Sequence, residues 1–263
     1  MKKVPRGDVV LKVSSGLSAR SITYLQREIE LLNRIRSPYF PRLHYNDVFT
    51  MDPDSEDPLP SRLFVTVEER IDGQPLNEAM FDFSAEQDAL YLMKELVAAC
   101  SLIWTMKPPM VHRDIKPANI LIRPDRSVCV IDLGIVREEG ARGPTETHIP
   151  FGPCTPAYST PEQAKNDKQN ISFKTDIFAI GTVIYEQVTR GNPFAPSGEL
   201  TYIDILHNVL TRDVTPLAES GAVSLEFSDL LSRMMAKEPY RRPRSPARLV
   251  DEIAELIRRN NVD

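Results

Sequence analysis

The sequence lacks features that several large protein classes require. Its three cysteines, Cys100, Cys129 and Cys154, show no C-x-x-C spacing, which argues against a disulfide framework or a structural zinc site and fits a reducing cytosol. The longest apolar-looking stretch, Ile177–Tyr185, is far shorter than the roughly 18 residues that span a membrane. No apolar segment follows the basic first residues, so a secretory signal is not expected.

A basic excess is also missing. The 263 residues include 32 Lys and Arg against 37 Asp and Glu, a formal net charge of −5, which argues against nucleic acid as a main partner. Glycine is sparse at 11 residues and proline frequent at 22, which indicates stiff, ordered loops. Hydrophobic residues make up 41% of the chain, enough for the core of one large domain or of two lobes. We therefore expect a cytoplasmic protein with no nucleic-acid partner and no membrane partner.

The most informative stretch is Val111–Asn119, which reads V-H-R-D-I-K-P-A-N. Two short apolar runs follow it, Ile120–Ile122 and Val128–Ile131, joined by a turn rich in Pro and Asp, and they predict a β-hairpin that leads to Asp132. Because a hairpin folds back on itself, Asn119 and Asp132 would lie close together. Side-chain oxygens of this kind suit Mg²⁺ beside phosphates. The simpler alternative is a polar surface turn in front of a hairpin.

These residues resemble the protein kinases, whose catalytic loop reads H-R-D-x-x-x-x-N and whose metal motif reads D-F-G. The resemblance implies that Asp114 is the catalytic base and that Lys116 neutralises the phosphoryl group as it transfers. It also implies that Asn119 and Asp132 are Mg²⁺ ligands, and that ATP and Mg²⁺ are the cofactors. Leu133 stands where the D-F-G motif has Phe and keeps that position apolar.

Lys12 lies in a β-branched run, Val9–Val13, that predicts a strand. This run resembles the V-A-I-K strand of the kinases, whose Lys pairs with the α- and β-phosphates. The next segment, Ser18–Ile35, has an apolar stripe and predicts a helix with Glu28 on its flank. By resemblance, Glu28 is the helix glutamate that pairs with Lys12. The alternatives are an edge strand with an exposed Lys and an ordinary solvated glutamate.

A predicted strand at Leu63–Val67 leads into a segment that resembles the kinase hinge, where backbone groups meet the adenine edge. The resemblance puts Glu69 and Ile71 in this nucleotide-binding hinge and Glu68 at the position called the gatekeeper. An acidic residue is unusual there, so a register shifted by one residue and a plain strand-to-loop turn both stay open. The acidic, proline-rich segment Met51–Pro60 in front of the strand predicts an exposed loop.

Four helices are expected after the hinge. The first is opened by a capping box at Ser84-Ala85-Glu86-Gln87 and carries Cys100 on its apolar face, as a core thiol rather than a nucleophile. The other three are Lys174–Arg190, closed by Gly191 as the C′ residue, Leu225–Met235 and Leu249–Arg259.

The segment Ile135–Ser159 has no apolar period and predicts a long, functional loop. The chain then reads T-P-A-Y-S-T-P-E-Q at Thr155–Gln163, which resembles the G-T-x-x-Y-x-x-P-E end of the kinase activation segment. Cys154 stands where the family usually has Gly. Lys116 together with Thr155 resembles the Ser/Thr-specific branch, which implies a protein substrate with Ser or Thr hydroxyls.

Two threonines of this loop, Thr145 and Thr147, are the candidate phosphorylation sites, whereas Thr155 is expected to make a fixed structural contact. Kinases of this pattern often use the Arg before the catalytic Asp, here Arg113, to bind a phosphorylated activation loop. The alternative is that these loop threonines stay unmodified.

Two further residues are expected to hold the site together. By resemblance, Asp176 holds the backbone of the His112–Asp114 turn; the alternative is an ordinary acid at a helix N-terminus. Arg242, in the sequence E-P-Y-R-R-P, resembles the kinase Arg that pairs with the P-E glutamate, here Glu162. The alternative for this Arg-rich stretch is a phosphate-binding patch.

The start of the chain departs from the family. Only eleven residues precede Lys12, and Gly7 is the sole glycine among them. Two strands and a turn need roughly fifteen or more residues, so the Gly-rich hairpin G-x-G-x-x-G is expected to be missing from this chain. Either the chain begins late or the protein naturally lacks the hairpin. We expect weaker ATP binding as a result, and a strand edge prone to pair with another chain.

The sequence thus predicts an α+β, bilobal, kinase-like fold. Residues 1–73 would form a truncated β-rich N-lobe with one helix, and residues 74–263 a mainly α-helical C-lobe. The predicted function is a Ser/Thr protein kinase that uses Mg-ATP. Two alternatives are a catalytically inactive kinase-shaped scaffold and a kinase-like enzyme acting on a small molecule. A scaffold would not need the full set of predicted catalytic and nucleotide-binding residues. A small-molecule kinase would not need the Thr155–Glu162 segment, which resembles a platform for protein substrates.

Overall fold

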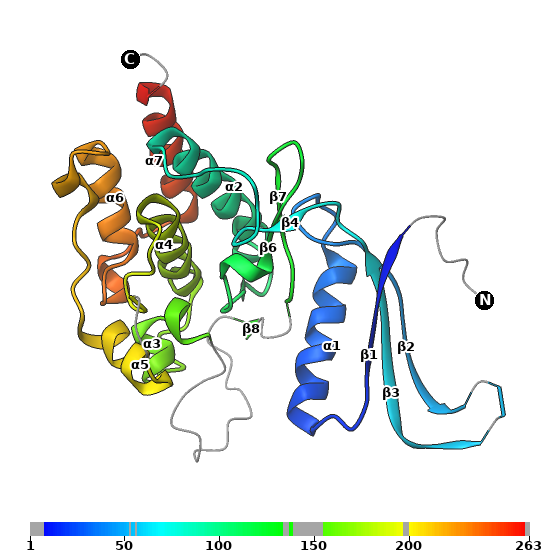
Figure 1. Ribbon diagram of the computed structural model, residues 1–263. Coiled ribbons are helices and arrows are strands. Elements are labelled where there is room, and N and C mark those ends of the chain that lie inside the picture. The colour runs from blue at the N-terminus through cyan, green and yellow to red at the C-terminus, as the bar shows by residue number, and fades with distance from the viewer. Residues whose placement is uncertain are drawn as a thin grey trace.

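The chain folds into a small lobe built on a β-sheet and a larger lobe built mainly from helices (Figure 1). The computed structural model describes residues 8–52, 54–55, 57–133, 137–138, 155–196 and 200–260. This arrangement is the α+β, two-lobed architecture that the sequence predicts.

The small lobe is organised around an antiparallel sheet. Its strands are β1 (Val9–Ser14), β2 (Leu43–Met51) and β3 (Pro58–Glu69), with β3 in the middle. Helix α1 (Ala19–Arg34) packs beside β2 and begins at Ser18, whose Oγ accepts a hydrogen bond from the Ser21 backbone N–H at 3.1 Å. This N-cap gives a partner to one of the N–H groups that the start of a helix leaves open.

Strand β3 is longer than the sequence predicted. Met51 pairs with Pro58, so the segment expected as a loop over Met51–Pro60 contributes to both strands, and only residues 52–57 lie between them. Pro58 is the first residue of β3, a position where its missing N–H removes no central ladder bond. The two strands extend beyond β1 as a ribbon (Figure 1), and pairing with each other outweighs the local turn signals there.

Helices α2 and α4 form the centre of the larger lobe. The main helices are α2 (Glu86–Trp104), α4 (Phe173–Thr189), α6 (Leu225–Met234) and α7 (Pro246–Asn260). Helix α7 packs on α2, and α6 packs on α4. The apolar positions predicted for α2, including Cys100, are buried. Burial raises the pKa of the Cys100 thiol well above its ordinary value, which fits a core group.

The remaining elements are one helix of ten residues and several shorter segments. They are α3 (Pro161–Ala164), α5 (Tyr202–Thr211), β4 (Gln74–Pro75), β5 (Met110–Val111), β6 (Ile120–Ile122), β7 (Val128–Val130) and β8 (Arg137–Glu138), with 3-10 turns at 117–119, 156–158, 217–220 and 239–241. Strands β6 and β7 form the predicted hairpin, and β4 pairs with β6 as a third strand. Within the described ranges, no helix combines the length and apolar character needed to cross a membrane.

Two predicted helix ends are wrong. Helix α2 begins after Ala85, which makes no side-chain capping hydrogen bond. Ser84 therefore lies one position before the N-cap, and its backbone N–H donates to Asp82 Oδ1 at 2.8 Å. The Glu86 carboxylate in the first turn accepts hydrogen bonds from Ser224 N–H and Oγ, both at 2.6 Å. Helix α4 ends at Thr189, and the next residue, Arg190, takes the left-handed conformation (φ 60°) expected of Gly191. Arg190 pairs with Asp82, a contact between segments far apart in sequence.

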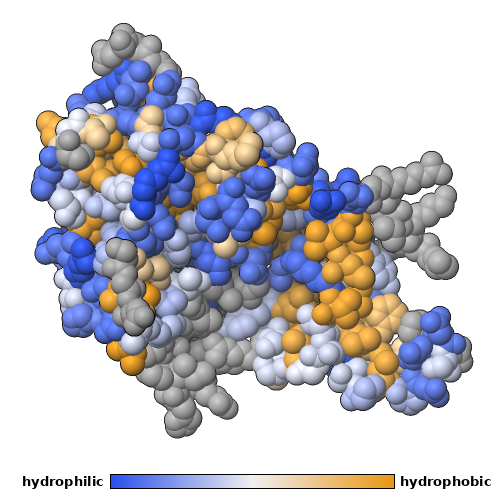
Figure 2. Space-filling view, in the orientation of Figure 1, coloured by the Kyte–Doolittle hydropathy of each residue, from blue (hydrophilic) through white to orange (hydrophobic). Residues whose placement is uncertain are grey.

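Hydrophobic side chains gather on the outer face of the small lobe. Figure 2 shows them over the region of β1 and β3. Leu11 and Val13 of β1, which alternate with the cleft-lining Val10 and Lys12, are 61% and 54% exposed. In the sheet formed by the described residues, β1 is an edge strand. The sequence-based expectation that this edge pairs with another chain stays a prediction.

Candidate active site

Lys12 on β1 contacts two buried carboxylates. Its Nζ lies 3.3 Å from Oε1 of Glu28 on α1, as predicted, and 2.9 Å from Oε1 of Glu68 on β3. The two glutamate side chains are only 10% and 6% exposed. The contact with Glu68 was not predicted from the sequence. It depends on the register of β1 against β3, which pairs Lys12 with Thr66 and so brings Glu68, two residues further along β3, to the same face.

These charges shift one another's pKa values. Burial lowers the pKa of the Lys12 ammonium, but the carboxylates of Glu28 and Glu68 outweigh burial and leave that pKa above its ordinary value. Burial raises the pKa of Glu28; Lys12 opposes this effect, and the nearby carboxylates of Glu68 and Asp132 add to it. The cleft therefore concentrates negative charge around a single ammonium group.

The H-R-D turn is held by the buried carboxylate of Asp176 on α4. Asp176 accepts hydrogen bonds from the backbone N–H groups of His112 and Arg113, both at 2.8 Å, and from the Trp104 indole at 2.7 Å. Arg113 has a φ of 74°, a left-handed conformation that neighbouring contacts must stabilise in a residue with a side chain. The contact of Asp176 with the turn is the one that the resemblance implies, and the contact with the Trp104 indole is additional to it.

Gln163 also holds this turn. Its Nε2 donates a hydrogen bond to the Arg113 carbonyl at 2.8 Å. The Gln163 side-chain oxygen and backbone N–H exchange hydrogen bonds with Thr160 across the first turn of α3, which fixes the direction of the amide. The sequence indicated the P-E-Q ending but not this contact, which joins the end of the activation segment to the catalytic turn.

His112 is fully buried beneath the catalytic turn. Burial lowers the pKa of its imidazole, which is therefore neutral near pH 7. Neutral imidazole can accept a hydrogen bond, and Nδ1 accepts the backbone N–H of Asp114 at 3.3 Å. His112 thus helps to orient the backbone that carries Asp114.

Asp114, Lys116 and Thr155 form a hydrogen-bonded triangle. Lys116 Nζ lies 2.7 Å from Asp114 Oδ2 and 2.9 Å from Thr155 Oγ1, and the Thr155 hydroxyl donates to Asp114 Oδ1 at 3.0 Å. Asn119 Nδ2 donates to the carbonyl oxygen and to Oδ2 of Asp114, at 3.0 and 3.1 Å. Both carboxylate oxygens of Asp114 are therefore held in place by side chains from two separate segments.

The β6–β7 hairpin brings Asn119 and Asp132 to one cleft. The Ile131 backbone N–H donates to the Asn119 carbonyl at 2.9 Å, and Asp132 follows with a left-handed φ of 62°. Asn119 and Asp132 both line a cleft of about 510 Å³. This volume lies within the range of roughly 300–1,000 Å³ typical of small-molecule sites.

The same cleft collects the other predicted nucleotide-binding residues. Lys12, Glu28, Glu69 and Ile71 all line it. The Glu69 backbone N–H donates to the Arg42 carbonyl at 2.8 Å, which ties the end of β3 to the segment before β2. The assignment of Glu69 and Ile71 to adenine recognition stays a prediction.

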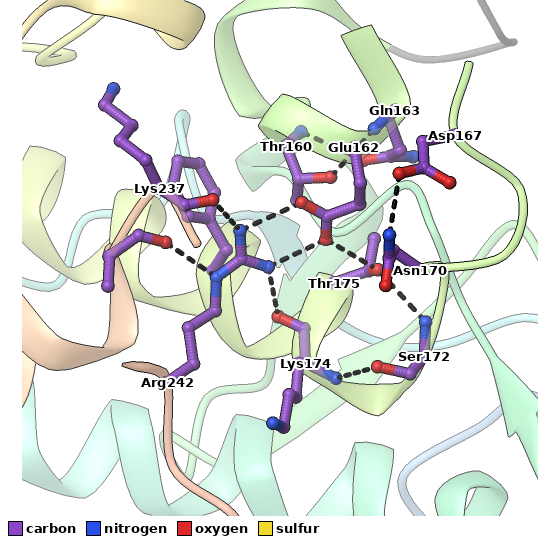
Figure 3. A network of polar contacts seen from close by, with 12 residues as sticks. Thr160, Glu162, Gln163, Asp167, Asn170, Ser172, Lys174, Thr175, Lys237 and Arg242 are labelled. Atoms are coloured by element: carbon purple, nitrogen blue, oxygen red, sulfur yellow. Dashed lines mark hydrogen bonds and ion pairs between the residues drawn. The ribbon is translucent and has the colours of Figure 1, made fainter. Parts of the chain in front are cut away.

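A buried ion pair joins α3 to the segment before α7 (Figure 3). Arg242 Nη1 and Nη2 lie 2.7 and 2.9 Å from the two carboxylate oxygens of Glu162, and the two side chains are 0% and 3% exposed. The other donors of Arg242 reach the carbonyl oxygens of Ala236, Lys174 and Lys237. With its donors engaged inside the protein, Arg242 is a structural residue, and the alternative of a phosphate patch is wrong for it.

Several predicted positions cannot be placed in this geometry. Thr145, Thr147 and Cys154 lie outside the described residues, as does Gly134 of the D-L-G motif. Thr155, where the description resumes, makes the contact with Lys116 given above.

Comparison with known proteins identifies the family. The protein kinase domain family matches residues 3–253. The chain belongs to this family. Kinase domains of this family generally use ATP and Mg²⁺.

Three curated relatives of this kinase domain are named as serine/threonine-protein kinases. Cds1 of Schizosaccharomyces pombe is 30% identical over 229 residues, which cover 85% of this chain and 46% of the relative. PknB of Mycobacterium tuberculosis is 30% identical over 169 residues, covering 64% of this chain and 26% of the relative. PknL of the same organism is 35% identical over 132 residues, covering 49% and 31%. The chain spans less than half the length of these relatives.

We expect Arg242→Leu to destabilise the kinase domain by about 3–5 kcal/mol, because it leaves the buried Glu162 carboxylate unpaired. The matched control is Arg241→Leu, whose side chain is 65% exposed, and which should change the unfolding free energy by less than about 0.5 kcal/mol. Urea denaturation measures both values. Equal stability of the two variants would show that the pair is not structural.

Proposed function

We propose that this kinase domain is a Ser/Thr protein kinase, which transfers the γ-phosphoryl group of Mg-ATP to Ser or Thr hydroxyls of a protein substrate. The observation that carries the proposal is the triangle of Asp114, Lys116 and Thr155 beside Asn119, which lines the cleft. Phosphoryl transfer depends mainly on positioning and on charge neutralisation, and this arrangement supplies both.

Each member of the triangle has a proposed role. Asp114 accepts or orients the proton of the substrate hydroxyl. Lys116 places a positive charge next to Asp114, where it offsets negative charge on the transferring group. Thr155, as a hydroxyl donor to Asp114 and an acceptor from Lys116, couples the activation segment to the base, so a displaced segment would leave Asp114 poorly oriented.

The residues on the hairpin fit a Mg²⁺ ion that arrives with the nucleotide. Asn119 directs its amide nitrogen at Asp114, so its side-chain oxygen is the atom available to a cation. We propose Asn119 and Asp132 as the protein ligands; when bound, Mg²⁺ neutralises phosphate charge. Among the described residues, no group of three or more His, Cys, Asp or Glu is arranged to hold a metal ion.

The rest of the nucleotide site is proposed by the same reasoning. Lys12, oriented by Glu28, faces the cleft and would bind the α- and β-phosphates. The backbone at Glu69 and Ile71 would meet the adenine edge. The lining carboxylates give the cleft negative charge before the nucleotide binds, which supports strong dependence of ATP binding on a divalent cation.

Three coarser expectations complete the proposal. We place the boundary between N-lobe and C-lobe at residues 73 and 74, supported by the pairing of β4 with β6 in the larger lobe. The buried free thiols of Cys100 and Cys129 support a cytoplasmic location. The acidic net charge supports a partner that is a protein rather than a nucleic acid.

We expect radiolabelled ATP to label a generic protein acceptor on Ser or Thr in the presence of this chain. Asp114→Asn should lower kcat by about 10²–10⁴-fold, because the base is lost. Asp251→Asn, an exposed change on α7, should leave kcat unaltered. Label appearing on small-molecule acceptors alone would favour a small-molecule kinase, and tight binding of a partner protein without any transfer would favour a scaffold.

We expect Asp132→Asn to abolish binding of Mg-ATP in isothermal titration calorimetry, because it removes the only carboxylate among the two proposed metal ligands. Asp251→Asn again serves as the charge-matched control. Unchanged affinity of Asp132→Asn would remove Asp132 from its proposed role.

Phosphorylation of Thr145 or Thr147 is expected in active protein, with Arg113 as the group that binds the phosphate. The double variant Thr145→Ala/Thr147→Ala should lose most activity, whereas Thr189→Ala, at the end of α4, should not. Mass spectrometry that finds neither site modified, together with full activity of the double variant, would reject this mechanism.

A further inference from the structure

Glu68 is the nearer of the two carboxylates that contact Lys12. Its Oε1 lies 2.9 Å from Lys12 Nζ, against 3.3 Å for Glu28. Its side chain is 6% exposed, so its charge needs a partner inside the protein, and Lys12 is the cation within reach. The Lys12 side chain is 41% exposed, so the contact joins a buried carboxylate to an ammonium group at the cleft surface, at the length of a charge-assisted hydrogen bond.

The two carboxylates reach Lys12 from different kinds of element. Lys12 pairs with Thr66 across the β1–β3 ladder, and Glu68 lies two residues beyond Thr66 on the same face of β3. The Thr66 hydroxyl donates to Glu68 Oε1 at 3.3 Å and helps to fix that side chain. The sheet itself therefore sets the Lys12–Glu68 contact. The contact with Glu28 depends on the position of a separate helix, α1.

The geometry allows both pairs at once. An ammonium group has three N–H donors, and two of them suffice for Glu28 and Glu68. One donor remains for a phosphate oxygen in the cleft, which Lys12 also lines. Glu68 is thus placed to add to Glu28 and not to replace it.

We propose that Glu68 is a second positioning residue for Lys12, one that keeps the ammonium directed into the cleft even when the Glu28 carboxylate is absent. The role in positioning Lys12 for ATP rests on the proposed kinase function, whereas the contact between Glu68 and Lys12 is observed in the structure. Glu68, the residue at the predicted gatekeeper position, thereby shares with Glu28 the role of orienting Lys12, which the sequence assigned to Glu28 alone. The consequence is that neither glutamate by itself is essential.

The test is a double-mutant cycle on the full chain. Glu28→Gln and Glu68→Gln should each keep at least about a tenth of the wild-type kcat/KM for ATP, since one carboxylate still holds Lys12. The double variant should lose at least about tenfold more than the product of the two single losses, approaching Lys12→Met. Glu78→Gln, an exposed change that removes the same charge, is the control and should match wild type.

A second readout follows Lys12 without any turnover. Acetic anhydride acetylates lysine side chains in the absence of nucleotide, and peptide mass spectrometry gives the rate at Lys12 relative to exposed Lys94. This rate reports whether the Lys12 ammonium is paired with carboxylates. Paired ammonium loses its proton less readily, so single variants should label Lys12 at nearly the wild-type rate. The double variant should label it several-fold faster. Urea denaturation confirms that each variant is folded.

The outcomes separate the possibilities. If Glu28→Gln alone is as inactive as Lys12→Met, or if the two changes are additive in both readouts, Glu68 is not a positioning residue. If Glu68→Gln binds ATP more tightly than wild type, Glu68 competes with phosphate for Lys12, which also overturns the proposal. Failure of the kinase function itself would appear differently: wild-type protein would transfer no phosphate, while the labelling cycle would still report whether the two carboxylates act together.

Discussion

The conformation of the His112–Asp114 turn depends on one buried carboxylate, that of Asp176. It has no exposed surface and is surrounded by donors from the Trp104 indole and from the backbone of His112 and Arg113. The left-handed backbone at Arg113 is costly in isolation, and these contacts, together with the Gln163 amide on the Arg113 carbonyl, stabilise it. The packing of α2 against α4 thereby sets the position of Asp114, although Asp114 belongs to neither helix.

The same physical rule recurs across the molecule. Buried charged side chains find partners elsewhere in the chain: Arg242 contacts Glu162 and the Lys174 carbonyl oxygen from remote segments, and Glu28 contacts Lys12. These contacts fix the relative positions of segments, which non-directional hydrophobic packing alone does not specify. Polar contacts therefore give the site its fixed geometry, while the apolar core around α2 and α4 gives the lobe its cohesion.

Sequence reasoning succeeded where the signal is local. The hairpin that brings Asn119 and Asp132 together follows from two short apolar runs and a turn, and α1 follows from its stripe and from Ser18. Sequence reasoning failed where a structural feature depends on a partner that lies far away in the sequence. The length of β3 depends on its pairing with β2, which the local turn signals do not show. The ion pair of Glu68 with Lys12 needs the register of two strands, which no local pattern states.

The ion pair of Glu162 and Arg242 spans 80 residues, and this separation has a consequence for synthesis of the chain. Ribosomes add roughly 5–20 residues per second from the N-terminus, so Arg242 is synthesised roughly 4–16 s after Glu162. During that interval the carboxylate cannot be buried without a large cost. The P-E-Q segment, and with it the Gln163 contact to the catalytic turn, can settle only late. A nascent chain that already carries its catalytic loop is therefore not yet an assembled kinase.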